Sequence, residues 1–444
     1  MTHSDTPVPS TTALRKIHSI TSLALQGCDP FAIHWHVRRR LLTSLILFAS
    51  HGHYLMEWVH DFGPKKVRVA ADLARRRVAD APDLPERWLT LANVLTESGE
   101  LDAEAACLRD AVERLPGSAK LRCRLASALI QHEAFEEARA QADAALALAP
   151  DDPEIRMLHF ELLARTRSWD AAGKSLDAMA GPVPTSGAIM TQERRLDTAS
   201  LLAFCEARLA EDPASTAAIF YKAIALARLG RVEEACAVMA LDKHVAVCDL
   251  PPPAGYGDGE TFRQLLAEEI CRNPTLASDP RGKATRDGRQ TRHLRQPDAV
   301  AIEALIAQIK RAAQDYAGRL SASDEAFAAA RPELARLDIW AVISGKDGRQ
   351  QAHLHPHGWL SGVYYVTAPR PAGANLYRGP LILGALDPHA HGVEPPWGTR
   401  EIEPVPGRLV LFPSYVPHAT QPSGVEGARI SVAFDVVPAK PWTQ

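Results

Sequence analysis

The sequence predicts a multidomain protein in which an α-helical solenoid is followed by an all-β barrel or sandwich that begins with helices. Three observations lead to this prediction. Prolines recur every 34 residues in the first half, a Pro- and Gly-rich segment ends that half near residue 260, and short apolar runs divided by Pro and Gly turns fill the second half. The first pattern is typical of stacked helical hairpins, and the last is typical of strands joined by turns.

Composition bounds the function before any motif is considered. A chain of 444 residues exceeds a typical single domain, so we expect two or three folding units. A net charge of −3 favours neither a nucleic acid nor a membrane surface as a partner. The seven scattered cysteines form no CxxC pair, which fits a reducing compartment, and the longest apolar run, "LLTSLILFA", is too short to span a bilayer. We therefore expect a soluble, cytoplasmic protein.

The helical half is expected to span residues 83–247. Prolines at 116, 150 and 184 lie 34 residues apart in a segment rich in Ala, Leu, Glu and Arg with helical apolar spacing. The units "RWLTLANVLTESGELDAEAACLRDAVERLP" and "KLRCRLASALIQHEAFEEARAQADAALALAP" resemble tetratricopeptide repeats. Such repeats present extended concave surfaces, so the resemblance implies a protein or peptide partner. A helical bundle without repeats is the alternative interpretation.

Residues 1–82 are expected to be a helical extension or cap that packs on the repeats. They include "AIHWHVRRRLLTSLILFAS" and "HGHYLMEWVHDF", which each contain a His-x-His pair, at 34–36 and 51–53. In a helix, side chains two residues apart project to roughly opposite sides and cannot share one metal ion. We therefore interpret these two pairs as structural or surface histidines.

The second half begins after the linker "VCDLPPPAGYGDGE". We expect a helix at 260–271, a polar loop "NPTLASDPRGKATRDGRQTRHLRQPD" and a second helix at 298–319. The predicted strands then follow in the runs "RLDIWAVIS", "GWLSGVYYVTA", "GPLILGAL", "GRLVLFPS" and "ARISVAFDVV".

A third His-x-His pair, in "QQAHLHPHGWLSGVYYV", lies at the start of this β-region. In a strand, residues two apart face the same side, so His353 and His355 can point into one cavity and share a metal ion. A third ligand must come from elsewhere, and His418, just after a predicted strand, is the best candidate. Arg429 and Ser431 share one face of the next strand, where the guanidinium can hold a carboxylate through two charge-assisted hydrogen bonds.

The order HxH, then "FPSYVPH", then "RIS" resembles the iron(II)- and 2-oxoglutarate-dependent oxygenases, and within them the bacterial and phage family marked by "HxHP" and "SGVYYV". The resemblance covers residues 255–444. The arrangement of the motifs in this segment is also similar to that of the prolyl hydroxylases. It implies that this half is a double-stranded β-helix, or jelly roll. The fold class is then a multidomain α and β chain: an N-terminal TPR-like solenoid followed by a jelly-roll domain with preceding helices.

For the metal site, the resemblance implies that His353 and His418 ligate Fe(II), while His355 occupies the place of the usual carboxylate. A neutral third ligand leaves more positive charge on the metal ion. Two possibilities stay open: His355 is itself a ligand, or it lies behind the ligands and a carboxylate such as Asp387 reaches the metal.

For the cosubstrate, the resemblance implies that Arg429 binds the distal carboxylate of 2-oxoglutarate, with help from Ser431 and Tyr365. Tyr364 and Tyr365 alternate faces, so we expect one of them to reach the cavity.

The function implied by the resemblance is a dioxygenase that uses O₂ and 2-oxoglutarate to hydroxylate a C–H bond. A protein or peptide recruited by the repeats is one candidate substrate. Two alternatives remain. One is a three-histidine, cupin-type metal enzyme without 2-oxoglutarate, and the other is a non-catalytic repeat adaptor with a degraded oxygenase domain.

Overall fold

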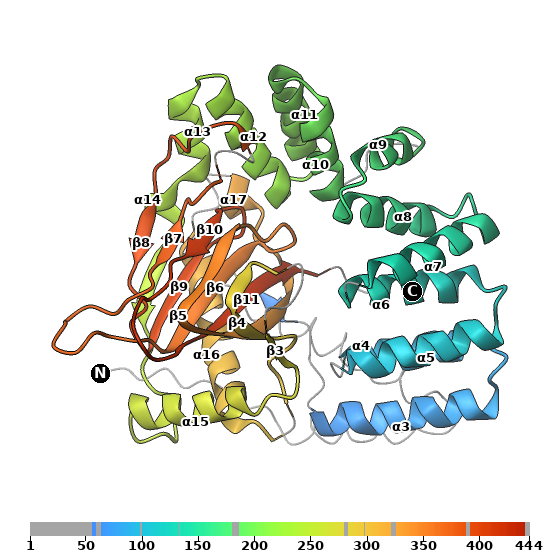
Figure 1. The fold of residues 1–444 in the computed structure, drawn as a ribbon, viewed down its shortest axis with the longest axis horizontal. Coiled ribbons are helices and arrows are strands. Elements are labelled where there is room, and N and C mark those ends of the chain that lie inside the picture. The colour runs from blue at the N-terminus through green and yellow to red at the C-terminus, as the bar shows by residue number, and fades with distance from the viewer. Residues whose placement is uncertain are drawn as a thin grey trace, which may run out of the picture. The chain divides into compact units, whose positions relative to one another are not determined.

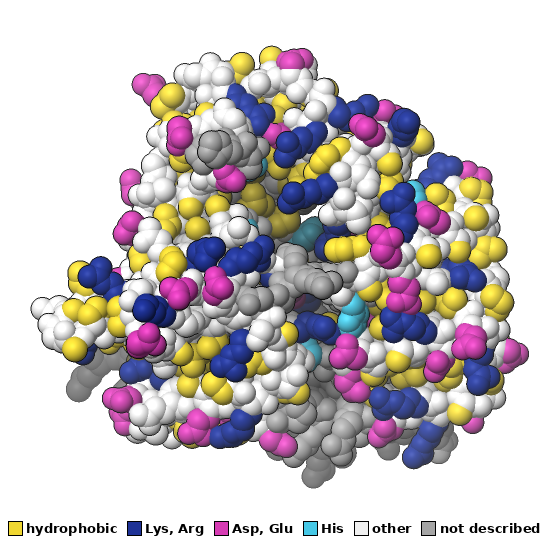
Figure 2. Space-filling view, in the orientation of Figure 1, with side chains coloured by type: hydrophobic (Ala, Val, Ile, Leu, Met, Phe, Trp, Pro, Cys, Tyr) yellow, Lys and Arg dark blue, Asp and Glu magenta, His cyan; other side chains and the backbone are white. Residues whose placement is uncertain are grey.

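A computed structural model describes most of the chain after residue 55. The described residues are 56–58, 64–97, 100–132, 134–179, 186–278, 283–296, 298–320, 326–387 and 391–439. The His-x-His pairs at 34–36 and 51–53 and most of the predicted N-terminal cap lie outside them. Within these ranges, no helix combines the length and apolar character needed to cross a bilayer. On the face in Figure 2, basic and acidic side chains are interspersed.

Helices form the first part of the described chain, and Figure 1 shows α3 to α8 stacked in order. They are α3 (Pro64–Asp80), α4 (Pro85–Glu97), α5 (Leu101–Arg114), α6 (Ala119–Gln131), α7 (Phe135–Leu148), α8 (Pro153–Arg165), α9 (Trp169–Asp177), α10 (Ser186–Arg195), α11 (Thr198–Glu211), α12 (Thr216–Arg228), α13 (Val232–Met239) and α14 (Leu241–His244). The first helices of three hairpins, α4, α6 and α8, begin 34 residues apart, and so do their second helices. The predicted 34-residue helical repeat is therefore confirmed.

The hairpins share the way their helices are capped and the way their apolar faces pack. Side-chain oxygens of Ser118 and Asp152 accept hydrogen bonds from backbone N–H groups in the first turns of α6 and α8, and Pro153 fits the first helical turn of α8. Leu91 and Leu125 hold equivalent positions 34 residues apart, and both are buried in one hydrophobic cluster. Each hairpin thus buries its apolar face against the next one, which is how a solenoid acquires a core.

A curled antiparallel sheet forms the C-terminal domain, with the strand order β2-β9-β6-β11-β5-β10-β7-β8. These strands are β2 (Ala246–Asp249), β5 (Leu334–His353), β6 (Leu360–Thr367), β7 (Leu381–Leu383), β8 (Arg400–Ile402), β9 (Arg408–Pro413), β10 (His418–Thr420) and β11 (Arg429–Pro438). The long strand β5 pairs with β11 over its first half and with β10 near its end. The predicted class, a helical solenoid followed by a jelly-roll domain, is confirmed.

Helices α15 (Gly259–Cys271), α16 (Val300–Arg319) and α17 (Ala326–Ala329) accompany the sheet. The first two agree with the helices predicted at 260–271 and 298–319. Trp359, directly before β6, is buried against the α17 segment: its ring stacks on Phe327 at 5.0 Å, and its indole N–H donates to the Phe327 carbonyl. This aromatic pair fixes the turn that follows the His-x-His motif.

Three segments differ from the prediction. Residues interpreted as linker form β2, which pairs with β9. The predicted polar loop contains β3 (Leu276–Ser278) and β4 (Thr285–Thr291), which pair with each other. Strand β4 also pairs with β5. Part of the predicted N-terminal helix is instead β1 (Glu57–Trp58), parallel to the start of β5. In each case ladder hydrogen bonds to a distant strand outweigh the local sequence preference.

Candidate active site

Three histidines meet where β5 ends and β10 begins. His353 and His418 are direct cross-strand partners, and His355 follows His353 by two residues. The ring centroids of His353 and His418 are 4.3 Å apart, and the His355 ring lies 5.1 and 5.0 Å from them. One potential ligand nitrogen from each ring lies within 4.8 Å of the others. The three residues therefore form one cluster that a single metal ion could share.

The Nδ1 atom of every ring in this cluster has a partner. In His353 and His418, Nδ1 lies 2.7 and 3.1 Å from the backbone carbonyl oxygen two residues earlier. In His355, Nδ1 lies 2.7 Å from both carboxylate oxygens of Asp435. An N–H at Nδ1 leaves the lone pair on Nε2, which is the form in which a histidine binds a metal. The hydrogen bonds thus prepare Nε2 on all three rings for coordination.

Burial keeps two of these rings uncharged. Desolvation, with the neighbouring His355, lowers the pKa of His353 to about 4. Burial and the two other imidazoles lower the pKa of His418 well below its usual value. Both rings are therefore neutral at physiological pH, and a neutral imidazole is the species that coordinates a metal ion.

The alternative carboxylate is not part of the cluster. Among the described residues, the group able to hold a metal ion here consists of the three histidines alone, and Asp387 is an exposed residue of the loop after β7. His391 in the same loop packs against Phe220 of α12, with ring centroids 5.3 Å apart. One carboxylate does approach the cluster: Asp435 lies behind His355. The sequence interpretation missed Asp435. Its position six residues after Arg429, on the same strand face, could have indicated it.

Arg429 lies at the other end of the same strand. Its guanidinium is buried and donates to the carbonyl oxygens of Gly379 and Gln421 through Nη1 and to the Thr420 hydroxyl through Nη2. Three of its five N–H donors are thus used by described residues, and two remain, one on Nε and one on Nη2. Two donors suffice for two parallel hydrogen bonds to one carboxylate. Burial also lowers the pKa of this guanidinium.

Tyr365 and Ser431 are cross-strand partners beside this guanidinium. The Tyr365 hydroxyl is buried and has no hydrogen-bond partner among the described residues. Burial raises its pKa to about 12, so the hydroxyl stays protonated and can donate a hydrogen bond. Tyr364 faces the other way and interacts with Arg263 of α15. As expected, one of the two tyrosines reaches the cavity. An unpartnered hydroxyl and a guanidinium with two spare donors fit an anionic group that these residues would bind.

One cavity joins the two ends. Its lining side chains come from the inner faces of β5, β6, β10 and β11 and from adjoining positions: Trp340, Gln350, His353, His355, Ser361, Gly362, Val363, Tyr365, Leu381, Phe412, His418, Thr420, Arg429, Ser431 and Ala433. All six residues that the sequence nominated for the site are in this list. Their convergence gives one end with the three histidines, one end with Arg429 and Tyr365, and a small apolar space between them.

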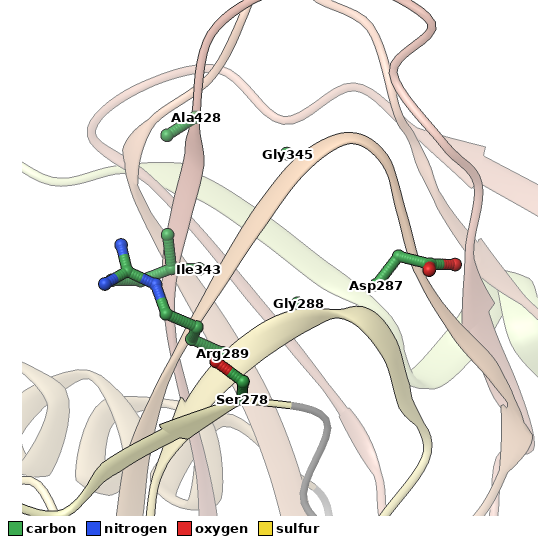
Figure 3. Close-up of a pocket in the computed structure, with 7 residues that line it drawn as sticks. All are labelled: Ser278, Asp287, Gly288, Arg289, Ile343, Gly345 and Ala428. Atoms are coloured by element: carbon green, nitrogen blue, oxygen red, sulfur yellow. The ribbon is translucent and has the colours of Figure 1, made fainter.

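A second hollow lies elsewhere on the domain and is drawn in Figure 3. Its lining includes Arg289 and Ile343, which are partners in the β4–β5 ladder and lie beside each other. Ile343 alternates with Val342 and Ser344, the partners of Ser431 and Arg429, so it points to the opposite face of the sheet. This hollow is therefore separate from the candidate active site.

The donor sets fit the groups implied by the sequence. Three imidazole ligands suit Fe(II) as well as other first-row metal ions, since nitrogen ligands bind the whole series. Arg429 and Tyr365 offer unused donors to a carboxylate such as the distal one of 2-oxoglutarate.

Comparison with known proteins identifies two segments. Residues 338–435 match the family model described as "Putative 2OG-Fe(II) oxygenase", and residues 105–177 match the tetratricopeptide repeat model. The first match contains the three histidines, Tyr365, Arg429, Ser431 and Asp435. No curated protein matches the chain.

Three solved structures are similar in part. A prolyl-4-hydroxylase from Pseudomonas putida is 19% identical, with 46% of this chain and 98% of that chain covered and a TM-score of 0.32. YrrB, described as a TPR protein with an unusual peptide-binding site, is 15% identical, with 39% and 93% covered and a TM-score of 0.32. A tetratricopeptide repeat protein from Parabacteroides merdae is 14% identical, with 40% and 72% covered and a TM-score of 0.34. The chain is thus similar to tetratricopeptide repeats over residues 105–177 and to the 2OG-Fe(II) oxygenase family over residues 338–435.

Proposed function

We propose that the chain is an Fe(II)- and 2-oxoglutarate-dependent dioxygenase that hydroxylates a C–H bond. In this proposal His353, His355 and His418 ligate the metal ion through Nε2. The support is the single cluster that the rings form and the hydrogen bond that each Nδ1 makes. The oxygenase family match of residues 338–435 supports the same reaction class.

The cosubstrate is assigned to the opposite end of the cavity. Bound iron and 2-oxoglutarate supply the oxidising chemistry: O₂ and 2-oxoglutarate are consumed, succinate and CO₂ leave, and one oxygen atom enters the substrate C–H bond. Arg429 would hold the distal carboxylate with its two unused donors, and the hydroxyl groups of Tyr365 and Ser431 would donate to the same group. The apolar side chains between the two ends would keep water away from the reacting region.

One observation favours this function most strongly. The cavity that contains the three imidazoles also contains a buried guanidinium with two unused donors beside an unpartnered hydroxyl. A buried hydroxyl without a partner, such as that of Tyr365, costs free energy, so it is expected where a ligand satisfies it. A carboxylate is the ligand that matches a planar guanidinium best.

We assign the substrate to a protein or peptide that the repeats recruit. The proposed boundaries are 83–247 for the repeats and 255–444 for the catalytic domain, preceded by a helical extension or cap at 1–82. A recruited peptide would be present at high effective concentration near the cavity, because the two domains are on one chain.

A second enzymatic function is favoured by the ligand set itself. A cluster that contains three histidines and no carboxylate ligand among the described residues is also compatible with a cupin-type metal enzyme that does not use 2-oxoglutarate. That function leaves the unused donors of Arg429 and the Tyr365 hydroxyl without a ligand, and so we rank it second.

The deciding experiment is an anaerobic titration of the Fe(II)-loaded protein with 2-oxoglutarate. The proposed function predicts a visible charge-transfer absorbance on titration and, in air, conversion of 2-oxoglutarate to succinate. The Arg429→Ala variant should bind Fe(II) but lose both signals. Arg349→Ala is the matched control, because Arg349 is exposed on β5 and paired with Asp287. Unchanged turnover in Arg429→Ala would show that the cosubstrate is bound elsewhere, and no turnover in the wild type would favour the second function or a non-catalytic adaptor.

A further inference from the structure

Asp435 is placed directly behind the unusual third histidine. Both of its carboxylate oxygens lie 2.7 Å from Nδ1 of His355, and each of the two side chains is only 13% exposed. A carboxylate this close to an imidazole accepts its N–H, so His355 carries its proton on Nδ1 and presents Nε2 to the cluster. The Trp340 ring stacks on His355 at 5.4 Å and holds the plane of the ring.

The carboxylate is itself held in place. The Ser361 hydroxyl donates to Oδ1 of Asp435 at 2.7 Å, and the Ser361 and Ser414 hydroxyls lie 2.8 Å apart. The backbone carbonyl of Ser414 in turn accepts the backbone N–H of His355 at 3.2 Å. These four residues form a closed hydrogen-bonded network, which fixes the carboxylate relative to the ring that it supports.

The geometry points to Asp435 as a positioning residue of the metal centre, an inference that rests on the proposed function. It orients His355 so that Nε2 can bind the ion. Its carboxylate also places a negative charge near the metal site, through contact with His355, which a third imidazole ligand by itself does not provide. The ligand set of the family has two histidines and one carboxylate. Here the carboxylate lies behind a histidine instead of on the metal ion.

The same strand connects this charge to the cosubstrate end. Arg429, Ser431, Ala433 and Asp435 alternate along β11, and the first three line the cavity. Residues two apart in a strand face the same side, which explains how one strand supplies both the guanidinium and the carboxylate. Six residues of strand separate them by about 20 Å, so Asp435 belongs to the metal end and does not neutralise Arg429.

The test is metal binding, measured without cosubstrate. Wild type, Asp435→Asn and Asp435→Ala are titrated with Co(II) under anaerobic conditions, recording the dissociation constant and the visible spectrum of bound Co(II). Loss of such a supporting carboxylate typically weakens metal affinity about 10- to 100-fold, and we expect this weakening with an altered spectrum in both variants. Asp338→Asn is the control: it removes one charge at the direct cross-strand partner of Asp435, but its carboxylate is paired with Arg336. It should leave affinity and spectrum unchanged.

A further variant guards against misfolding. Ser361→Ala removes a donor to Asp435 without touching either member of the Asp435–His355 pair, and should weaken Co(II) binding by a smaller factor. If Asp435→Asn and Ser361→Ala bound Co(II) like the wild type with the same spectrum, Asp435 would have no role at the metal and the proposed function would stand. If the wild type bound no metal ion, the proposed function would fail and this inference with it.

Discussion

Replacing Tyr365 with Phe removes a single hydroxyl group and tests the cosubstrate end of the cavity. The side chain is 1% exposed, and its hydroxyl has no hydrogen-bond partner among the described residues. Burying a hydroxyl without a partner costs about 1–3 kcal/mol in proteins. The free energy of unfolding of the ligand-free Tyr365→Phe variant should therefore equal or exceed that of the wild type.

Ligand binding should change in the opposite direction. If the hydroxyl donates to the carboxylate of 2-oxoglutarate, it contributes about 1.5–3 kcal/mol, as hydrogen bonds to charged groups do. Since 1.4 kcal/mol corresponds to a factor of ten, the dissociation constant of 2-oxoglutarate should rise about 10- to 100-fold. A variant that is as stable as the wild type but binds its ligand less well is the outcome that the structure predicts.

Two measurements check this prediction. Urea denaturation gives the free energy of unfolding, and an anaerobic titration of the Fe(II)-loaded protein gives the dissociation constant of 2-oxoglutarate. Tyr364→Phe is the matched control: it removes the same group from the neighbouring residue, which interacts with Arg263 instead, and it should leave ligand affinity unchanged. Equal 2-oxoglutarate affinity in Tyr365→Phe and wild type would refute the role assigned to this hydroxyl, and a clear loss of stability would mean that it has a partner in the protein.

Three other predictions concern the cavity and its histidines. Ala433→Leu should fill the space between the two ends and abolish 2-oxoglutarate binding while Co(II) affinity is retained; undiminished 2-oxoglutarate affinity would place the cosubstrate outside this space. Gly379→Ala should weaken 2-oxoglutarate binding more than Gly373→Ala, because both glycines have positive φ but only a Cβ at 379 would collide with the Arg429 guanidinium; equal effects would contradict this. The pKa of about 4 for His353, against about 6.5 when unfolded, means that the unfolded chain binds a proton first on acidification. The free energy of unfolding of the metal-free protein should fall as the pH drops from about 6.5 to 4, and less so in His353→Asn, as urea denaturation at several pH values would show; identical profiles would contradict a buried neutral ring.

The helical repeats could be predicted from the sequence because their period is local. Each hairpin repeats the same apolar and small positions, and the starts of α4, α6 and α8 follow the predicted spacing of 34 residues. The strands β5, β6, β9 and β11 were predicted for a similar reason, since each is an apolar run long enough to be recognised by itself.

The strands that were missed lack such a run. β4 reads "TRDGRQT" and has no apolar residue, so its strand state depends on ladder hydrogen bonds to β5 more than 50 residues away. β2 precedes three consecutive prolines and was taken for linker, yet it pairs with β9 over four residues. Strands of this kind, polar or very short, depend on the partner strand, which a local pattern does not contain.

The candidate site was predicted where strand periodicity applied and was missed where only the fold brings residues together. His353, His355 and His418 were nominated by motif and spacing, and the structure clusters them. Asp435 lies 80 residues after His355, and its contact with that ring arises because β11 crosses the domain beside β5 and β6. Asp387 was the more obvious carboxylate in the sequence, but its loop does not bring it into the cluster.

The position of β11 between β5 and β6 makes this strand intolerant of changes in its length. It is hydrogen-bonded on both sides, so its residues cannot slide along either neighbour without breaking two ladders at once. Inserting a single residue between Ser431 and Asp435 would turn Asp435 away from His355, and a deletion would do the same. The distance between the two ends of the cavity, and hence the length of the ligand that can bridge them, is set by the number of residues in this one strand.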